Sequence, residues 1–575
     1  MVQEITFEGE EYQTESAVLL DWSVSVGSVV ERGETLCTLE SPGGTIEITS
    51  KVDGKVLQLF YAPGDEVQSG TALALVGEPG EALSDDLSTP GVSADPDDML
   101  REAGGIPTSP VGSGSDIDLF VIGGGPAGYR AALRAARHGA NVVLAEENLL
   151  GGTCLNFGCV PAKTLIHIAR VYRGAADSAA MGIETGRLSY NHKTALDWKN
   201  RSVERLRRGI EGQLKRAGVR VVHAGAHFLG PGKVLAGGTE YRTRYILIAN
   251  GAQGTPFNVD ISDASIPVLG SAAAFDLNEV PDRMLILGGG YIGLEIAGLF
   301  AALGSRVTVM ESESDVLSFA GSDIGRQMRL AMDTTRFIVN AQARRVSGNT
   351  VHYADERGEQ SLETDCVIQV VGRRPRIGGV DEHGIEVNEH GITVDGYMRT
   401  NLEGVYAAGD VTGKLMLAHA AYRMADVAVN NMFGDGTDTV NMNAMPWIVY
   451  TMPELAGCGR NQVQAEADGL EVEVNLLPLA SNNRYLAEHA DARGWCRLVS
   501  EVRSGKLVGA FMMGHGVSEL IAQAAMAIDT GMSVHEISKI VAPHPTMSEA
   551  FRDAADSASH ISKVMAADHL SNPHL

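Results

Sequence analysis

The stretch IDLFVIGGGPAG, residues 117–128, joins a compact apolar run to a glycine-rich turn. The apolar run is typical of a buried β-strand, and the residues that follow, to about His138, are typical of a helix. Gly123, Gly125 and Gly128 have the spacing GxGxxG. The first glycine permits a tight turn, the second lets backbone approach a pyrophosphate, and the third lets helix pack on strand. The stretch therefore predicts a dinucleotide-binding unit, with the helix N-terminus facing the phosphates.

The same unit recurs at a second place in the chain, after the strand-like run Met284 to Leu287. Its glycines are Gly288, Gly290 and Gly293. Each copy also has an acid 23 residues after its first glycine, from 123 to Glu146 and from 288 to Glu311. Such a carboxylate can accept hydrogen bonds from ribose hydroxyls. A single GxGxxG motif is weak evidence for dinucleotide binding, but two copies with acids at matching positions indicate two dinucleotide sites.

The neighbours of Glu311 indicate which nucleotide the second unit binds. A carboxylate repels a 2′-phosphate, and the next residues, Ser312, Glu313 and Ser314, supply no arginine. The second site is therefore predicted to take NAD and not NADP.

Two cysteines stand close together in GGTCLNFGCVPAK, residues 151–163. Cys154 and Cys159 could form a structural disulfide, half of a metal site or a redox pair. No second close Cys/His pair follows, which argues against metal, and no metal site is predicted. Six cysteines in 575 residues indicate a reducing compartment, which disfavours a structural disulfide. A redox-active dithiol/disulfide pair is the best interpretation, and a helix start there would stabilise a thiolate.

Composition narrows the possible partners. The chain has 46 basic and 72 acidic residues and a net charge of −26, which argues against nucleic acid or an anionic membrane as partner. The first ten residues show no signal peptide. The longest apolar region, around Met284 to Met310, contains charges and many glycines and predicts no membrane span. We therefore expect a cytoplasmic protein.

The N-terminal part of the chain has a different pattern. Residues 1–77 contain a near-repeat at an offset of 37 residues, in which Gly27, Val30, Gly33 and Leu36 recur as Gly64, Val67, Gly70 and Leu73. Alternating strands between glycine turns predict a small β-sandwich of two related halves. Residues 78–115 have no aromatic residue and are rich in Pro, Gly, Ser and Asp, which predicts a mobile acidic linker. An α/β pattern follows.

From about Asp116 to Ala555 the chain resembles the flavoprotein disulfide reductases, and within them it is most similar to the dihydrolipoamide dehydrogenases. The motifs that carry the resemblance are GGGPAGY, GGTCLNFGCVPAK, GGGYIGLE, VGRRP, GVYAAGD, MLAHAA, IVYTMPE and HPTMSEAF. The resemblance implies an α/β fold with two Rossmann-like domains, FAD in the first and NAD in the second, and a C-terminal α+β dimerisation domain. The expected domains are 116–265 for FAD, 266–375 for NAD, 376–444 returning to FAD, and 445–575 for dimerisation.

The resemblance also implies individual cofactor contacts. Cys159 would lie against the flavin, and Cys154 would exchange with the substrate thiol. The other implied contacts are Asp410 at the ribityl chain, Lys163 and Glu295 beside the flavin ring, Tyr291 near the nicotinamide, and Gly372 in VGRRP.

A base is needed because each substrate thiol must lose a proton. His544 in HPTMSEAF is the candidate, and Glu549 can hold its imidazole and stabilise the imidazolium. A lone histidine is more often structural, but the motif favours catalysis here. In the family this pair comes from the partner subunit, which implies a homodimer with shared active sites.

The chain departs from the family pattern at a few positions. Asn250 stands where a threonine is usual, Ala162 where a serine or threonine precedes the lysine, and Ala542 where a second histidine is frequent. The N-terminal module resembles the lipoyl/biotinyl carrier fold, but Gly43 occupies the position of the carrier lysine. We expect a docking or tethering role for the module; a decayed domain is the alternative.

The expected function is dihydrolipoyl dehydrogenase activity, oxidising protein-bound dihydrolipoyl groups of a 2-oxoacid dehydrogenase or related complex with reduction of NAD. One alternative is a related reductase similar to glutathione or mercuric reductase, although the tail HISKVMAADHLSNPHL lacks paired cysteines. Another is a scaffold protein that binds a partner through its N-terminal module.

Overall fold

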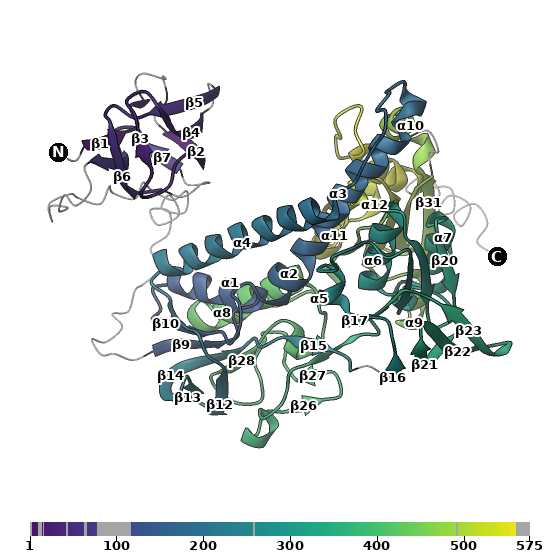
Figure 1. Cartoon of the computed structure of the whole chain (residues 1–575). Coiled ribbons are helices and arrows are strands. Elements are labelled where there is room, and N and C mark those ends of the chain that lie inside the picture. The colour runs from purple at the N-terminus through teal and green to yellow at the C-terminus, as the bar shows by residue number, and fades with distance from the viewer. Residues whose placement is uncertain are drawn as a thin grey trace. The chain divides into compact units, whose positions relative to one another are not determined.

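The computed structural model describes residues 3–9, 14, 16–41, 44–61, 66–77, 117–256, 259–489 and 493–558. The chain divides into two compact units, Met1–Gly114 and Ser115–Leu575 (Figure 1). The predicted linker, residues 78–115, lies outside the described residues.

The first unit consists of two four-stranded antiparallel sheets, ordered β1-β8-β6-β3 and β5-β4-β2-β7. The strands are β1 Gln3–Thr6, β2 Ser16–Trp22, β3 Val29–Val30, β4 Thr35–Ser41, β5 Gly44–Thr49, β6 Gly54–Leu59, β7 Glu66–Gln68 and β8 Ala72–Gly77. The repeated residues Val30 and Val67, and Leu36 and Leu73, are all buried, as a sandwich of two related halves requires. The tip of the β4–β5 hairpin, with Gly43 at the position of the carrier lysine, lies outside the described residues.

The second unit begins with the predicted strand–turn–helix. β9 (Ile117–Ile122) leads through the glycine turn into α1 (Pro126–Arg137), and β10 (Val142–Ala145) follows. β11, β10, β9, β14 and β28 pair in parallel, and β13 and β12 continue from β14 as antiparallel strands. These further strands are β11 Arg220–Val222, β12 Ala226–Gly230, β13 Lys233–Ala236, β14 Thr239–Ile248 and β28 Val405–Ala407.

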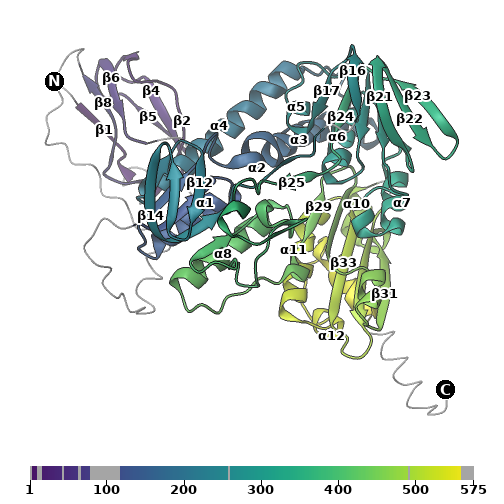
Figure 2. The same ribbon diagram turned by 90° about the horizontal axis from the view of Figure 1, so that it is seen from below.

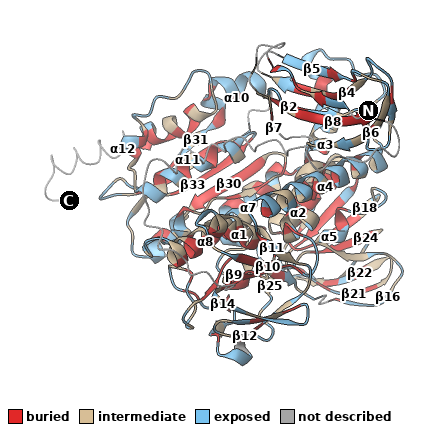
Figure 3. Ribbon diagram, turned by 90° about the vertical axis from the view of Figure 1, so that its left-hand side faces the viewer, coloured by how far each residue is buried: buried red, intermediate tan, exposed pale blue. Residues whose placement is uncertain are grey.

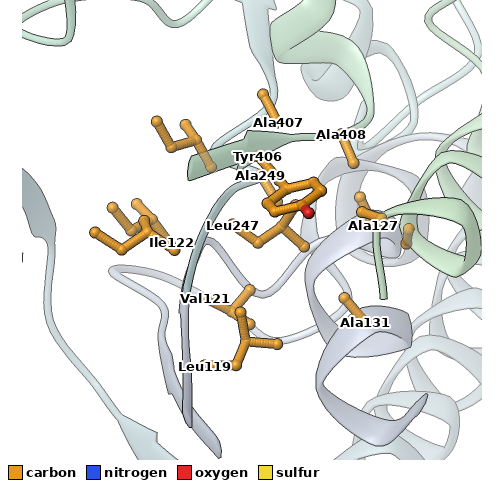
Figure 4. Close-up of a cluster of buried hydrophobic side chains, with 14 of the residues drawn as sticks. Leu119, Val121, Ile122, Ala127, Ala131, Leu247, Ala249, Tyr406, Ala407 and Ala408 are labelled. Carbon is orange, nitrogen blue, oxygen red and sulfur yellow. The ribbon is translucent and has the colours of Figure 1, made fainter. Parts of the chain in front are cut away.

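Small side chains let helix and sheet approach closely in this first dinucleotide domain. Ala127 and Ala131 of α1 face apolar residues of the central strands, among them Val121 and Leu247 (Figure 4). Along its other side α1 packs on α8 (Ala418–Phe433) (Figure 2). The packing fixes the start of α1, and hence the glycine turn, at the carboxyl end of β9.

The second dinucleotide domain repeats the arrangement. β18 (Arg283–Leu287), α6 (Tyr291–Ala302) and β19 (Arg306–Met310) form its first unit. The sheet is entirely parallel in the order β17-β24-β18-β19-β20. Its outer strands are β17 Val268–Gly270 and β20 Thr335–Ile338, and β24 Cys366–Gln369 lies between β17 and β18. A second sheet beside it contains β16 Asp260–Ala264, β21 Gln342–Gly348, β22 Thr350–Asp355 and β23 Gly358–Glu363. Short pairs are formed by β15 Ala252–Gly254 with β25 Arg373–Pro375, and by β26 Val387–Asn388 with β27 Gly391–Ile392.

The chain then forms an antiparallel five-stranded sheet in the order β29-β30-β33-β32-β31 (green to yellow in Figure 2). Its strands are β29 Trp447–Val449, β30 Glu454–Gly459, β31 Val472–Pro478, β32 Trp495–Glu501 and β33 Leu507–Gly514. The helices of this part include α9 Gln462–Ala467, α10 Asn483–Glu488, α11 Val517–Thr530 and α12 Val534–Ile537. Residues 548–558 are helical as well. α11 packs on the sheet, as expected for an α+β layer.

The remaining helices are α2 Gly152–Phe157, α3 Cys159–Asp177, α4 His192–Arg216, α5 Ser271–Ala274 and α7 Ser322–Ala331. Buried residues concentrate in the sheets and on the inner helix faces (Figure 3). Cys37, Cys366, Cys458 and Cys496 are buried and not paired in disulfides. Within the part of the chain that the structure describes, no helix is both long and apolar enough to cross a membrane. The predicted fold class is confirmed.

Candidate active site

A cavity of about 750 Å³ lies at the carboxyl end of β9 and extends to the two cysteines. Most of the predicted site residues line it, and they come from both dinucleotide domains and from α2 and α3. These lining residues are Gly123, Gly125, Glu146, Cys154, Cys159, Lys163, Gly290, Tyr291, Glu295, Gly372 and Asp410. The topology thus brings together residues that are almost 300 positions apart in the sequence.

The glycines of each turn divide into two kinds. A Cβ on Gly128 would lie 1.7 Å from the Gly123 carbonyl oxygen, and one on Gly293 would lie 2.0 Å from that of Gly288. Gly123 and Gly288 have φ of +103° and +111°, which side chains disfavour. The packing of the protein itself therefore requires the first and third glycines.

The middle glycines have no such packing reason. A Cβ on Gly290 would meet nothing within 4 Å, and one on Gly125 would meet only the Gly152 Cα at 3.9 Å. Each middle glycine leaves open space beside a helix N-terminus, where a pyrophosphate is favoured. Both turns therefore fit a bound dinucleotide.

The two acids take equivalent positions behind the turns. Glu146 accepts a hydrogen bond from the Gly124 N–H at 2.7 Å, and Glu311 accepts one from the Gly289 N–H at 2.6 Å. Glu311 also accepts from the Ser312 hydroxyl at 3.1 Å, and it forms no ion pair with an arginine among the described residues. A site with this donor and acceptor set suits a ribose with a free 2′-hydroxyl.

The two cysteines occupy different helices. Cys154 lies in α2, while Cys159 is the first residue of the 19-residue helix α3. The hydrogen bond from the Cys154 thiol and then the charge of Lys163 outweigh burial and lower the pKa of Cys159 to about 7. The same hydrogen bond, together with burial, raises the pKa of Cys154. The reduced pair thus holds its thiolate on Cys159, at a helix N-terminus that favours negative charge.

Lys163 and Glu295 form an ion pair across the cavity wall. The Lys163 Nζ donates to both Glu295 oxygens, at 2.9 and 2.8 Å, and lies 4.5 Å from the centre of the Tyr450 ring. The Tyr450 backbone N–H also donates to Glu295 at 3.2 Å. This pair joins α3 of the first domain to α6 of the second. Sequence reasoning missed Tyr450, although it lies in the motif IVYTMPE.

The other wall carries Asp410, Arg373 and Asn250. Burial raises the pKa of Asp410, and the Arg373 guanidinium, 3.7 Å away, opposes that rise. The Asn250 amide donates to the Arg376 carbonyl at 2.9 Å, which orients its oxygen. That oxygen is buried and has no hydrogen-bond partner among the described residues. An unpartnered buried acceptor on this wall fits a hydroxyl-bearing cofactor such as FAD, because such an acceptor otherwise carries a desolvation penalty.

Tyr291 begins α6 and lines the cavity beside Glu295. Its ring stacks on Phe319, with centroids 4.6 Å apart, and meets Trp447 edge-on at 6.0 Å. Phe319 and Trp447 were not predicted, since neither stands in a motif and both reach Tyr291 only through the fold.

His544 and Glu549 form the predicted pair but do not line the cavity. His544 Nδ1 lies 3.1 Å from Glu549 Oε1, and the His544 side chain is 63% exposed. The backbone N–H of Thr546 and then the His544 ring lower the pKa of Glu549. Within a single chain the structure therefore does not bring His544 to the cysteines.

This fold, with two dinucleotide cradles and a cysteine pair between them, defines a flavin-dependent disulfide reductase. The pyridine nucleotide-disulphide oxidoreductase family model matches residues 117–425, and that of its dimerisation domain matches residues 445–555. A third model, for the biotin/lipoyl domain of biotin-requiring enzymes, matches residues 8–76.

Curated relatives point to one branch of that family. Dihydrolipoyl dehydrogenase of Staphylococcus aureus is 33% identical over 456 residues, covering 77% of this chain and 97% of that protein. Dihydrolipoyl dehydrogenase of Bacillus subtilis is 34% identical over 450 residues, covering 76% and 98%.

Solved structures with the same fold include the HOCl-induced flavoprotein disulfide reductase RclA of Escherichia coli, with a TM-score of 0.68, 28% identity and coverage of 76% of this chain and 99% of RclA. LpdA of Mycobacterium tuberculosis has a TM-score of 0.70 and 26% identity, with coverage of 77% and 99%.

The chain belongs to the pyridine nucleotide-disulphide oxidoreductases, in the dihydrolipoyl dehydrogenase family. The predictions of an oxidoreductase and of FAD and NAD(H) as its cofactors are confirmed at the level of this family.

Proposed function

We propose that this protein is an NAD-dependent dihydrolipoyl dehydrogenase that acts as a cytoplasmic homodimer. The observation that carries the proposal is the Cys154–Cys159 pair, which lines one cavity together with the open middle glycines of both dinucleotide turns. Such a cavity suits transfer of an electron pair from a dithiol towards a pyridine nucleotide. The domain boundaries and site roles expected from the sequence form part of this proposal.

In the oxidised enzyme Cys154 and Cys159 would form a disulfide. One thiol of the dihydrolipoyl group loses its proton to a base and attacks the Cys154 sulfur, and Cys159 leaves as a thiolate. The second substrate thiol, also deprotonated, then attacks the mixed disulfide and displaces Cys154. The substrate is oxidised by two electrons to lipoyl disulfide, and the cysteine pair is reduced by two. The low pKa of Cys159 suits it as the leaving group in the first step.

FAD, when bound, would supply the two-electron redox chemistry that links the reduced cysteines to NAD. The residues suited to hold it are the first glycine turn, Glu146, Asp410 and Asn250. The second glycine turn and Glu311 are suited to hold NAD. Lys163 contributes the positive charge that holds the Cys159 thiolate at the end of the cavity.

The base would be His544 of a second copy of the chain. Its ring is mostly exposed while Glu549 is buried, so the pair presents an oriented imidazole at the surface. Glu549 would stabilise the imidazolium that forms when the substrate thiol is deprotonated. This assignment makes the dimer the unit of function.

The lipoyl group would come from another protein, because Gly43 supplies no amine for its attachment. We propose a lipoylated protein of a 2-oxoacid dehydrogenase or related complex as the substrate, and the N-terminal module as a docking or tethering element. Its separate hydrophobic core supports an independent role.

A second candidate function is suggested by the similarity to RclA, for which a Cu(II) complex has been solved with a TM-score of 0.68 and 28% identity. This protein would then reduce a metal ion or another oxidant with electrons from a pyridine nucleotide. The shared cysteine-pair fold supports both candidates.

Anaerobic reduction followed by turnover tests the two candidates. The main proposal predicts a yellow protein that shows a long-wavelength thiolate–flavin band on two-electron reduction, and that forms NADH rapidly from dihydrolipoamide and NAD. A colourless protein would contradict it. So would a protein that oxidises NADH with Cu(II) but does not react with dihydrolipoamide.

A further inference from the structure

Asn482 is a buried amide that connects helix α10 to the loop carrying His544. It is 4% exposed and stands at the N-cap of α10, directly before Asn483. Its oxygen accepts from the Tyr485 N–H at 2.9 Å, which caps the helix. Its nitrogen donates to the Thr546 carbonyl at 3.0 Å. Both ends of the amide are therefore engaged, each with a different segment.

Thr546 is the next link towards the histidine. Its N–H donates to Glu549 Oε2 at 3.0 Å, and its hydroxyl donates to the Pro543 carbonyl at 2.7 Å. Glu549 in turn lies 3.1 Å from His544 Nδ1. The backbone of Thr546 thus connects Asn482, which bonds to its carbonyl, with Glu549, which bonds to its N–H and orients the imidazole.

The two ends of this connection differ in burial. Tyr485, one turn into α10, is fully buried, and its hydroxyl donates to the Arg493 carbonyl at 2.5 Å, so the start of the connection is fixed in the core. The His544 side chain at the other end is 63% exposed. Further contacts of the loop are Gln523 with the Ser548 hydroxyl at 3.1 Å, and Arg552 with Glu549 at 3.7 Å. Gln523 of α11 and Asn482 at the start of α10 both reach the segment between His544 and Glu549. Asn482 is the one of these two that bonds to Thr546, the residue whose N–H donates to Glu549.

We propose that Asn482 is a positioning residue for the dithiol half-reaction, because it holds the backbone of Thr546 and thereby fixes Glu549 and the imidazole that Glu549 orients. The inference rests on the proposed function, in which His544 deprotonates the substrate thiol. The half-reaction between NADH and the flavin does not use this base. Loss of the hydrogen bond from Asn482 to Thr546 should therefore slow the dihydrolipoamide half-reaction and leave the NADH half-reaction unchanged.

Two substitutions remove the hydrogen bond from Asn482 to the Thr546 carbonyl and keep the N-cap of α10. Asn482→Ser and Asn482→Asp both keep an oxygen that can cap α10, and both remove the amide donor to the Thr546 carbonyl. A matched control exists at Asn461, which caps the equally short α9 through the Gln464 N–H at 2.9 Å and donates to the Ala320 carbonyl at 3.0 Å. Asn461→Ser and Asn461→Asp make the same chemical change away from the His544 loop.

The test is stopped-flow reduction of the FAD-loaded, full-length protein by dihydrolipoamide and, separately, by NADH. Misplacement of a base by about 1 Å costs up to about 100-fold, so both Asn482 variants should lose about tenfold to 100-fold in the dihydrolipoamide rate and show a displaced pH profile. Their rates with NADH should stay within about twofold of the unchanged chain. The Asn461 variants should keep both rates and the pH profile.

Wild-type dihydrolipoamide rates in both Asn482 variants would overturn the inference. So would equal losses in both half-reactions, or failure of both variants to bind FAD, since either result describes a structural residue. If the unchanged chain is reduced by NADH but not by dihydrolipoamide, the proposed function fails, and the role of Asn482 fails with it. That outcome is recognised without any variant.

Discussion

Cys154 and Cys159 are alike in type but differ in their electrostatic surroundings. Lys163 and Glu295 act in opposite directions on the Cys159 thiolate, because the lysine lowers the pKa of Cys159 and the glutamate raises it. The thiolate is therefore present above about pH 7 and is lost as the pH falls below that value. Within the ion pair the partly exposed Lys163 neutralises the buried charge of Glu295.

Substituting the two members separately should move the thiolate titration in opposite directions. Lys163→Gln should raise the pKa of Cys159, since it removes the nearby positive charge, and Glu295→Gln should lower it. The measurement is a pH titration of the long-wavelength thiolate–flavin absorbance in the two-electron-reduced protein. Displacement of the midpoint in the same direction by both substitutions would show that altered packing, not charge, controls it.

At the residue scale, much of the cavity could be predicted from motifs, because chemistry fixes residue type and spacing there. Tyr450 and Phe319 could not, since their contacts with Lys163 and Tyr291 arise from tertiary packing between distant segments. Asn250 was recognised as a departure from the family pattern, but only the structure shows its unpartnered oxygen. Its orientation depends on the Arg376 carbonyl, more than 100 residues away.

At the scale of elements, the two glycine turns could be predicted closely because each depends on local backbone geometry. The strand expected at Ile117 to Ile122 is β9, and the run Met284 to Leu287 lies within β18. What could not be predicted is how the two dinucleotide domains share one cavity, because that depends on packing between α3 and α6. Periodicity within one segment carries no information on such packing.

Two alanine substitutions in one turn should separate packing from binding. Gly293→Ala places a Cβ 2.0 Å from the Gly288 carbonyl oxygen, and should destabilise the protein by about 1–3 kcal/mol or more. Gly290→Ala meets no protein atom within 4 Å, so its unfolding temperature should not fall, whereas KM for NAD should rise about tenfold or more. Thermal unfolding and steady-state kinetics measure the two effects. An unchanged KM in the Gly290 variant would mean that NAD does not use this turn.

At the scale of the whole molecule, the N-terminal module is a separate compact unit with its own hydrophobic core. Removal of residues 1–77 should therefore leave kcat/KM for free dihydrolipoamide unchanged within about twofold. Co-sedimentation with a lipoyl-bearing complex should weaken, because the docking element is gone. Loss of activity on the free substrate would contradict the tethering role, and unchanged co-sedimentation would assign docking to residues after 77.

The position of His544 outside the cavity leads to a test of the dimer itself. If Cys154 of one chain works with His544 of the other, Cys154→Ser and His544→Gln homodimers are both inactive, since every site lacks one partner. In a hybrid of the two variants, one site lacks both residues and the other has both.

Statistical mixing by co-refolding gives about half hybrids, each with one intact site of two, so activity should recover to about a quarter of that of the unchanged protein. A mixture that stays inactive, although differently tagged chains are shown to have exchanged, would place the cysteine and its base in one chain. Recovery is possible only if the active site is built across the dimer, because no single chain in the mixture carries both residues.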